Sequence, residues 1–140
     1  MLRRFALTAA ASVAALSAVP ATAHASTPPV PPADQLTVTV TGTGGEADGK
    51  YKLTCHPTGG THPNAAEACE RLKEVTVWGT DPFAPVPKGA MCTMQYGGPA
   101  TAHVTGTWQG RPVNATYDRS NGCEIGRWNA LVPVLPATSA

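Results

Sequence analysis

The chain has 140 residues, of which 14 are glycine and 14 are proline, while charged residues make up 14% and aromatic residues 6%. So many residues that break helices exclude a coiled coil or a long helical bundle. The formal net charge is only +1, which argues against a protein that binds nucleic acid mainly through its charge. The length indicates one domain, and four cysteines in so short a chain suggest disulfides.

The N-terminal segment has the parts of a secretory signal peptide. Arg3 and Arg4 supply positive charge, residues 5–19 are an apolar run, and residues 23–25 (Ala-His-Ala) are suited to cleavage. The apolar run has roughly 15 residues, fewer than the ~20 that span a bilayer, which disfavours a membrane anchor. We therefore expect residues 1–25 to be a signal peptide and the protein to be secreted and extracellular, with neither a membrane nor a nucleic-acid partner.

The first half of the mature chain contains clear periodic patterns. Residues 26–35 predict a proline-rich N-terminal arm, which precedes a folded domain over residues 36–140. Leu36–Thr41 alternates apolar and polar side chains, as a half-buried strand does, and Tyr51–Cys55 alternates in the same way. Apolar residues then recur at helical spacing and predict an amphipathic helix from Asn64 to about Val75.

The second half begins with a long loop. The stretch Gly79–Pro99 is rich in glycine and proline and has no regular period, and long loops in compact domains are usually functional or disordered. Thr101–Trp108 and Pro112–Tyr117 predict a hairpin. Cys123–Asn129 predicts a short helix, and Leu131–Leu135 an edge strand, since its proline excludes a central one. The expected fold is therefore α+β: an antiparallel sheet of four to five strands packed against one longer and one short helix.

Four cysteines allow three pairings. Cys55 lies on the inner face of the second expected strand, and Cys69 lies on the apolar face of the helix that should cover it. We expect these two to pair, because secretion exposes them to an oxidising environment. Cys92 is then left with Cys123, and this second bridge would tie the middle of the long loop to the segment after the hairpin.

The sequence contains no known motif of an enzyme active site or a metal site. No serine stands in a Gly-x-Ser-x-Gly motif, and Ser120 is better suited to capping a turn. Four residues of the types that bind metals lie close in sequence, namely Cys55, His56, His62 and Cys69, but their spacing matches no short zinc motif. We expect no catalytic residue, no metal and no cofactor.

The segment Ala90–Pro99 places Met91 and Met94 on either side of Cys92 and Thr93. Methionine is a common residue for filling gaps in a core, so both side chains could be buried. The alternative is a presented loop, in which the two methionines enter separate pockets of a partner's groove.

Five short motifs occur in a specific order and spacing. They are Gly60-Thr61-His62-Pro63 after Cys55, Ala68-Cys69, Met91-Cys92-Thr93-Met94-Gln95-Tyr96, Trp108-Gln109-Gly110 and Ser120-Asn121-Gly122-Cys123-Glu124. In this combination the chain resembles the Streptomyces subtilisin inhibitor family, over residues 36–124 and with matching cysteine spacing. The resemblance implies a small secreted protein, generally a homodimer, that inhibits subtilisin-like serine proteases and is not an enzyme.

The resemblance also assigns roles to individual residues. It implies that the reactive bond is Met94–Gln95, that Met94 enters the primary specificity pocket of the protease, and that Met91 fills the apolar subsite three residues upstream. The rest of the protease-contacting loop would be Cys92, Thr93 and Tyr96. The family's bridges correspond to Cys55–Cys69 and Cys92–Cys123, which agrees with the pairing above, and Asn121 matches a position that supports the loop from behind.

The chain departs from the family pattern at several places. Thr93 stands where proline is common, Gln95 replaces an aliphatic residue, and Gly97 with Gly98 makes the downstream side more flexible. The tail after Arg127 also follows the family poorly. Two alternatives to an inhibitor remain, namely a secreted binding or cross-linking module without inhibitory activity and a small exported hydrolase that uses Ser120.

Overall fold

The computed structural model describes residues 12, 14–15, 17–28 and 34–138. The chain divides into two units, residues 1–30 and 31–140. The described residues up to 28 form no helix or strand, and no helix in the described ranges is long and apolar enough to cross a membrane. Residues 1–11, 13, 16 and 29–33 lie outside the described residues, so the signal peptide and the proline-rich arm stay predictions.

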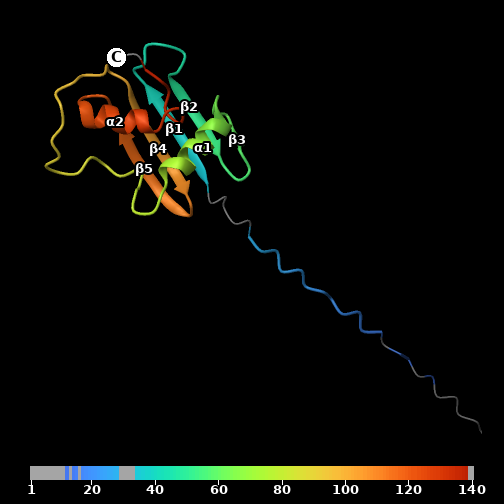
Figure 1. The fold of residues 1–140 in the computed structure, drawn as a ribbon. Coiled ribbons are helices and arrows are strands. Elements are labelled where there is room, and N and C mark those ends of the chain that lie inside the picture. Colours follow the sequence, from blue (N-terminus) through green and yellow to red (C-terminus); the bar gives the residue numbers. More distant parts are fainter. Residues whose placement is uncertain (1–11, 13, 16, 29–33, 139–140) are drawn as a thin grey trace, which may run out of the picture. The chain divides into compact units, whose positions relative to one another are not determined.

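The second unit is built on one antiparallel sheet of five strands (Figure 1). In the order in which they lie in the sheet, the strands are β3 (Gly59–Gly60), β2 (Gly49–Thr54), β1 (Gln35–Thr41), β4 (Thr101–Trp108) and β5 (Arg111–Tyr117). The α+β class and the hairpin of β4 and β5 are confirmed. The two-residue strand β3 was not predicted, because a Gly-Gly pair carries no periodic pattern.

The sheet buries one of its faces. Along β1, the side chains of Leu36, Val38 and Val40 are at most 1% exposed, while the threonines between them are half-buried. This alternation follows from the strand itself, because successive side chains point to opposite faces. The buried residues of all the longer strands join one core, so the described part of the second unit has one apolar interior.

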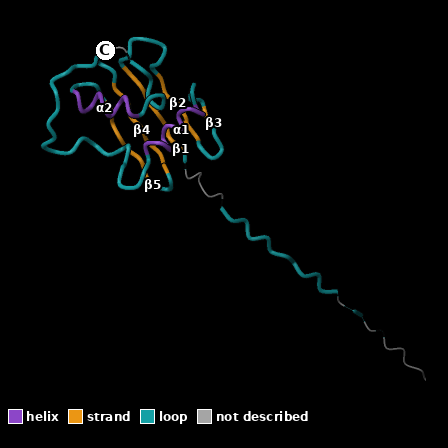
Figure 2. The backbone as a smooth tube through the Cα atoms, in the orientation of Figure 1, coloured by secondary structure: helices purple, strands orange, loops and turns teal. Residues whose placement is uncertain are grey.

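Both predicted helices are present, as α1 (Ala65–Val75) and α2 (Gly122–Ala130). Helix α1 contributes Ala68 and Leu72 to the core, and α2 contributes Trp128, all three with 0% exposure. Figure 2 shows the long loop that leaves α1, runs outward beside α2 and returns to β4. This loop is the region in which we expected a functional segment.

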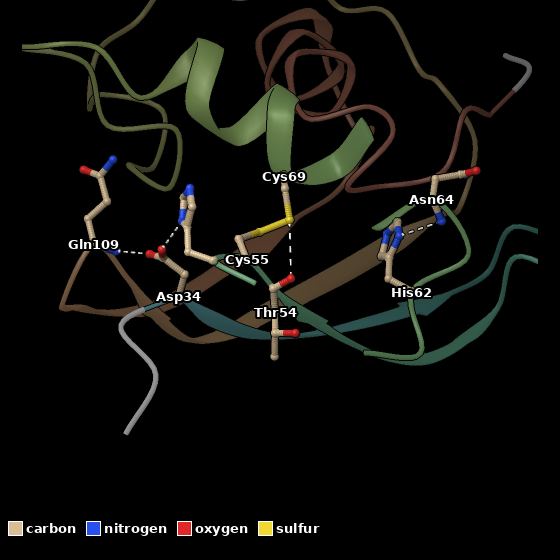
Figure 3. Close-up of a disulfide and its surroundings, with 8 residues drawn as sticks. Asp34, Thr54, Cys55, His62, Asn64, Cys69 and Gln109 are labelled. Carbon is tan, nitrogen blue, oxygen red and sulfur yellow. Dashed lines mark hydrogen bonds and ion pairs between the residues drawn. A yellow bond between two sulfur atoms is a disulfide. The ribbon is translucent and has the colours of Figure 1, made fainter. Parts of the chain in front are cut away.

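The predicted disulfide between the strand and the helix is confirmed. Cys55 and Cys69 are bonded, with their Cα atoms 5.7 Å apart, and the bridge joins the end of β2 to α1 (Figure 3). Beside it, Asp34 accepts a hydrogen bond from the backbone N–H of Gln109 at 2.8 Å. The start of β1 is thereby fixed to the turn of the hairpin.

The segment Leu131–Leu135 forms turns, so the predicted edge strand is wrong. Leu131, Val134 and Leu135 are all at most 1% exposed, and a strand could not bury all three on one side because alternate residues face opposite ways. The N–H of Leu135 instead donates to the carbonyl of Leu131 at 3.2 Å. The chain therefore goes on turning after α2 and closes the core with its tail.

Candidate functional site

Between Gly79 and Pro99, the exposed large apolar side chains all lie in one short segment, Met91–Gly97, which we call the presented segment. Trp78, near the start of the long loop, is exposed as well. Met91 is 98% exposed, Met94 is 99% exposed and Tyr96 is 69% exposed. Burying a side chain of this size contributes ~1.5–3 kcal/mol, so three such side chains left in water point to a partner that covers them. The alternative in which both methionines fill core gaps is wrong.

The upstream half of the presented segment is attached to α2. The predicted bridge between Cys92 and Cys123 is present, with Cα atoms 5.2 Å apart. Next to it, the backbone N–H of Gly122 donates to the carbonyl oxygen of Thr93 at 3.0 Å. One covalent bond and one hydrogen bond thus fix the backbone immediately before Met94.

The downstream half is attached to the segment between β5 and α2. The N–H of Gly97 donates to the carbonyl oxygen of Arg119 at 2.7 Å, and the Nε–H of Arg119 donates to the carbonyl oxygen of Gly97 at 2.9 Å. Both hydrogen bonds of this pair, which we call the Arg119–Gly97 pair, end on the same glycine. Met94, Gln95 and Tyr96 therefore lie between two attachments.

Arg119 is an unusual residue to find in the interior, because its side chain is only 3% exposed. Its Nη1 donates to Oδ1 of Asn129 at 3.0 Å, and its guanidinium carbon lies 5.8 Å from the centre of the Trp128 ring. The cation therefore interacts with two neutral acceptors and an aromatic face, an arrangement that keeps a buried guanidinium hydrogen-bonded.

The side chains on either side of Met94 turn toward α2. Oγ1 of Thr93 donates to Oε1 of Gln95 at 3.3 Å, as expected for alternate residues of an extended backbone, whose side chains share a face. A Cβ atom at Gly122 would overlap Oγ1 of Thr93 and would lie 3.4 Å from Oε1 of Gln95. Glycine at position 122 is therefore what lets this side of the presented segment approach the helix.

Asn121 begins α2. Its side-chain oxygen accepts a hydrogen bond from the N–H of Glu124 at 3.0 Å, the usual contact of an N-cap residue. The contact is local to the helix, and through it Asn121 fixes the first turn that carries Gly122 and Cys123. The support of the loop that the resemblance assigned to Asn121 stays a prediction.

The part of the long loop that precedes the presented segment has attachments of its own. The hydroxyl of Tyr117 donates to the carbonyl oxygen of Pro82 at 2.9 Å, and Nε of Arg127 donates to that of Ala84 at 3.0 Å. The guanidinium carbon of Arg127 lies 4.3 Å from the centre of the Tyr117 ring. Burial raises the pKa of Tyr117 far above its usual value, so its hydroxyl keeps the proton that it donates.

Sequence reasoning missed Tyr117, Arg119 and Arg127 as residues that hold the loop. No periodicity distinguishes a buried arginine that binds carbonyl oxygens from an exposed one, because its acceptors are distant in sequence. Ser120 lies where a turn cap was expected, since its hydroxyl and its N–H both donate to Oδ1 of Asp118, at 2.6 Å and 2.9 Å. Among the described residues, no group of three or more His, Cys, Asp or Glu is placed to hold a metal ion.

Comparison with known proteins gives a consistent result. Residues 31–121 match the model of the family described as subtilisin inhibitor-like. The subtilisin inhibitor of Streptomyces violaceus is 37% identical over 131 residues, which cover 84% of this chain and 84% of that protein. The subtilisin inhibitor-like protein 1 of Streptomyces cacaoi is 39% identical over 85 residues, 57% of this chain and 73% of that protein.

Among solved structures, the chain matches sermetstatin of Streptomyces caespitosus, crystallised in complex with subtilisin of Bacillus licheniformis. The identity is 25%, the match covers 71% of this chain and 97% of that one, and the TM-score is 0.44. The length and identity of the sequence matches are the deciding findings, and the chain belongs to the subtilisin inhibitor-like family.

Proposed function

We propose that the protein inhibits subtilisin-like serine proteases by binding as a substrate does, with Met94–Gln95 as the reactive bond. The observation that carries this proposal is the position of Met94, whose side chain is 99% exposed while the backbone on both sides is attached to the domain. The family to which the chain belongs consists of protease inhibitors and not of enzymes, which supports the inhibitory role and argues against a hydrolase that uses Ser120.

The attachment explains why such a segment would inhibit. A flexible peptide loses conformational entropy when it enters the groove of a protease, whereas a segment held by Cys92–Cys123 has lost most of it during folding. The affinity therefore rises without additional contacts. The serine of the protease can attack the carbonyl of Met94, but both ends of the cut chain stay attached to the domain, so religation competes with hydrolysis.

The side chains of the presented segment set the specificity. Met94 is unbranched and uncharged, so it suits a broad apolar pocket, whereas a trypsin-like pocket binds lysine or arginine. Met91, three residues upstream, is 98% exposed and available for an apolar subsite, and Cys92, Thr93 and Tyr96 complete the contact surface. We expect strong inhibition of subtilisin, weaker inhibition of chymotrypsin-like proteases and little inhibition of trypsin.

Titration of subtilisin with the purified protein tests the proposal, and we expect activity to fall linearly to zero at a one-to-one ratio of binding sites. In Met94→Lys, the ratio of the inhibition constant for subtilisin to that for trypsin should rise by about 100-fold or more. A charged side chain is costly to bury in an apolar pocket, whereas a trypsin-like pocket binds lysine. Val77→Lys is the matched control, because it adds the same charge at an exposed position of the long loop that lies outside the presented segment. Full subtilisin activity at excess protein would reject the proposal and favour the binding or cross-linking module.

The same resemblance leads us to propose that the protein is a secreted homodimer that begins at Ser26. Light scattering of the purified protein should give twice the mass of one chain, and the mass of the protein collected from the medium should correspond to residues 26–140. A monomer at every concentration would contradict the dimer, and a retained N-terminal segment would contradict the cleavage site.

A further inference from the structure

We propose that Arg119 is a positioning residue that holds the newly formed amine of Gln95 in place after cleavage, so that the reactive bond closes again. The inference rests on the proposed function, because it concerns the fate of the same bond. It concerns the downstream half of the presented segment, which has no disulfide of its own.

The two halves of the presented segment differ in how they are held. Upstream of Met94, the chain is joined to α2 through Cys92–Cys123. Downstream, the Arg119–Gly97 pair is the first attachment, with distances of 2.7 and 2.9 Å. If the Met94–Gln95 bond opens, the acyl end stays tied by a covalent bond, while the amine end depends on hydrogen bonds to one glycine.

The Arg119–Gly97 pair determines how far the amine can move. Gln95 and Tyr96 alone separate the amine from Gly97, and two residues of extended chain span at most about 7 Å. Without the pair, the five residues from Gln95 to Pro99 would be free to move, because Ala100 is the next buried residue. Five residues of extended chain would let the amine move by about 17 Å. Gly98 lies in this stretch with a φ of 97°, a backbone conformation that glycine adopts readily because it has no Cβ atom.

Arg119 is suited to this role because its guanidinium is itself immobilised. The side chain is 3% exposed and is held by Asn129 and by the face of Trp128. In the part of the chain that the structure describes, no ion pair involves this arginine. Its hydrogen bond to Gly97 is charge-assisted and shielded from water, which makes it stronger than a bond between neutral groups.

A Cβ atom at Gly97 would lie 2.9 Å from Nε of Arg119 and 2.9 Å from Cγ1 of Ile125. Contacts this short do not occur for real Cβ atoms, so only glycine lets the backbone lie against the guanidinium. Gly97, which the sequence predicts to make the downstream side more flexible, is therefore also the residue that makes the attachment possible.

The chemical step that the pair controls is acyl transfer in both directions. In the forward direction, Oγ of the protease serine bonds to the carbonyl carbon of Met94, the C–N bond breaks, and the serine proton passes through the protease base to the nitrogen of Gln95. In the reverse direction, that amine attacks the ester, the C–O bond breaks, and the proton returns to the serine. Water completes hydrolysis only if it reaches the ester before the amine does.

The experiment compares Arg119→Met with the wild-type protein in complex with subtilisin. Methionine keeps an unbranched stem against Trp128 and removes the side-chain donors to Gly97 and Asn129. The backbone bond from the N–H of Gly97 to the carbonyl oxygen of residue 119 stays, so the variant removes one of the two hydrogen bonds that hold the amine end. We expect the protease to recover activity at least about tenfold faster, which corresponds to about 1.4 kcal/mol, with mass analysis showing cleavage after Met94. The association rate should stay within about twofold, because the presented side chains are unchanged.

The controls separate positioning from folding. Arg111→Gln removes an exposed arginine at the start of β5 and should leave both rates unchanged. Arg119→Lys, which can still donate to Gly97, should restore most of the lifetime of the complex. If Arg119→Met does not fold, Asn129→Ala, which removes the partner of Nη1 at an exposed position, should still speed up cleavage.

If Arg119→Met unfolds cooperatively and its reactive bond is cleaved at the wild-type rate, the inference is overturned. If only Asn129→Ala folds, an unchanged cleavage rate in that variant overturns it as well. A lower association rate together with a lower melting temperature, without faster cleavage, would also overturn it, because it would show that Arg119 only supports the fold. If the wild-type protein itself leaves subtilisin active, the proposed function fails, and this outcome is seen before any variant is compared.

Discussion

The two disulfides join very different parts of the molecule. Cys55–Cys69 ties β2 to α1 beside the core, and Cys55 is only 3% exposed. Cys92–Cys123 ties the presented segment to α2, and the methionines around it are 98% and 99% exposed. One bridge lies where packing already determines the structure, and the other lies where little packing exists.

Loop entropy does not distinguish the two bridges. Their sequence separations are 14 and 31 residues, and the chain-entropy model gives ~3 and ~3.7 kcal/mol for loops of this size. The difference lies in what each bridge fixes. The core bridge adds stability to a structure that burial already specifies, whereas the loop bridge specifies the conformation of residues that have few other contacts. We therefore expect stability and inhibition to respond separately to the loss of each bridge.

The largest effect should follow removal of the loop bridge. In Cys92→Ser with Cys123→Ser, the backbone before Met94 keeps only the hydrogen bond from Gly122, so the segment regains the freedom of a peptide substrate. We expect the lifetime of the complex with subtilisin to fall by about 100-fold, which corresponds to about 2.7 kcal/mol and lies below the ~3.7 kcal/mol of the loop model. Protease activity would be followed over time after mixing.

The unfolding transition of this double variant should remain cooperative, because the core of the sheet and the helices is intact. If the complex of the double variant is as long-lived as that of the wild-type protein, the presented segment is held by something other than the bridge, and the comparison fails.

Removal of the core bridge should have the opposite result. Cys55→Ser with Cys69→Ser should lower the free energy of unfolding by about 3 kcal/mol, because the unfolded chain gains freedom while Ala68 and Leu72 stay packed. Urea titration measures the loss. At 25 °C, inhibition of subtilisin should stay within about threefold of the wild-type value, since the bridge does not touch the presented segment. A loss of inhibition from folded protein would contradict the separation of the two regions.

A smaller effect is expected at the contact of the presented segment with α2. In Gly122→Ala, the new Cβ would overlap Oγ1 of Thr93, and overpacking of this kind typically costs about 1–3 kcal/mol. We expect inhibition to weaken by about tenfold, measured as the dissociation rate of the complex.

Gly126→Ala is the matched control for this variant. It lies on the same helix, and a Cβ there meets nothing within 4 Å, so it should leave inhibition unchanged and stabilise the helix by about 0.5–1 kcal/mol. Adding Thr93→Ala to Gly122→Ala should recover part of the loss, because the overlapping hydroxyl is gone. Purely additive effects of the two substitutions would contradict direct contact between the positions.

The smallest effect concerns the attachment of the long loop by Tyr117. Burial raises the pKa of Tyr117 above its ordinary value of 10.0, so the unfolded state releases this proton more easily than the folded state. The stability contribution is complete below about pH 10 and is lost as the pH rises above it, by up to about 1.4 kcal/mol per pH unit. Urea titrations from pH 9 to 11 measure the slope.

Tyr117→Phe should be less stable than the wild-type protein by about 1 kcal/mol at pH 8, because the hydrogen bond to Pro82 is lost. Its stability should also fall less steeply above pH 10. Equal slopes in the two proteins would show that another group causes the alkaline loss.

Local patterns in the sequence determined most of the secondary structure. Alternation predicted β1, β2 and the hairpin, and helical spacing predicted α1, because each pattern reports which side of a single element is apolar. The expected position of Cys55 on a strand and of Cys69 on a helix face was enough to predict their pairing, and Cys92 and Cys123 followed, although β2 ends one residue before Cys55. The pattern around Met91 and Met94 does not decide whether their side chains are exposed, since methionine suits both a core and a surface.

Only the tertiary structure decided how the chain ends and how the presented segment is held. Leu131, Val134 and Leu135 lie in turns, and packing into the common core buries all three side chains, which the alternation of a single strand could not do. Arg119 holds Gly97 across 22 residues of sequence, and no periodic pattern can show a contact of that kind. Periodicity describes how an element meets water, whereas these contacts depend on which distant backbone carbonyl a buried side chain reaches once the elements have packed.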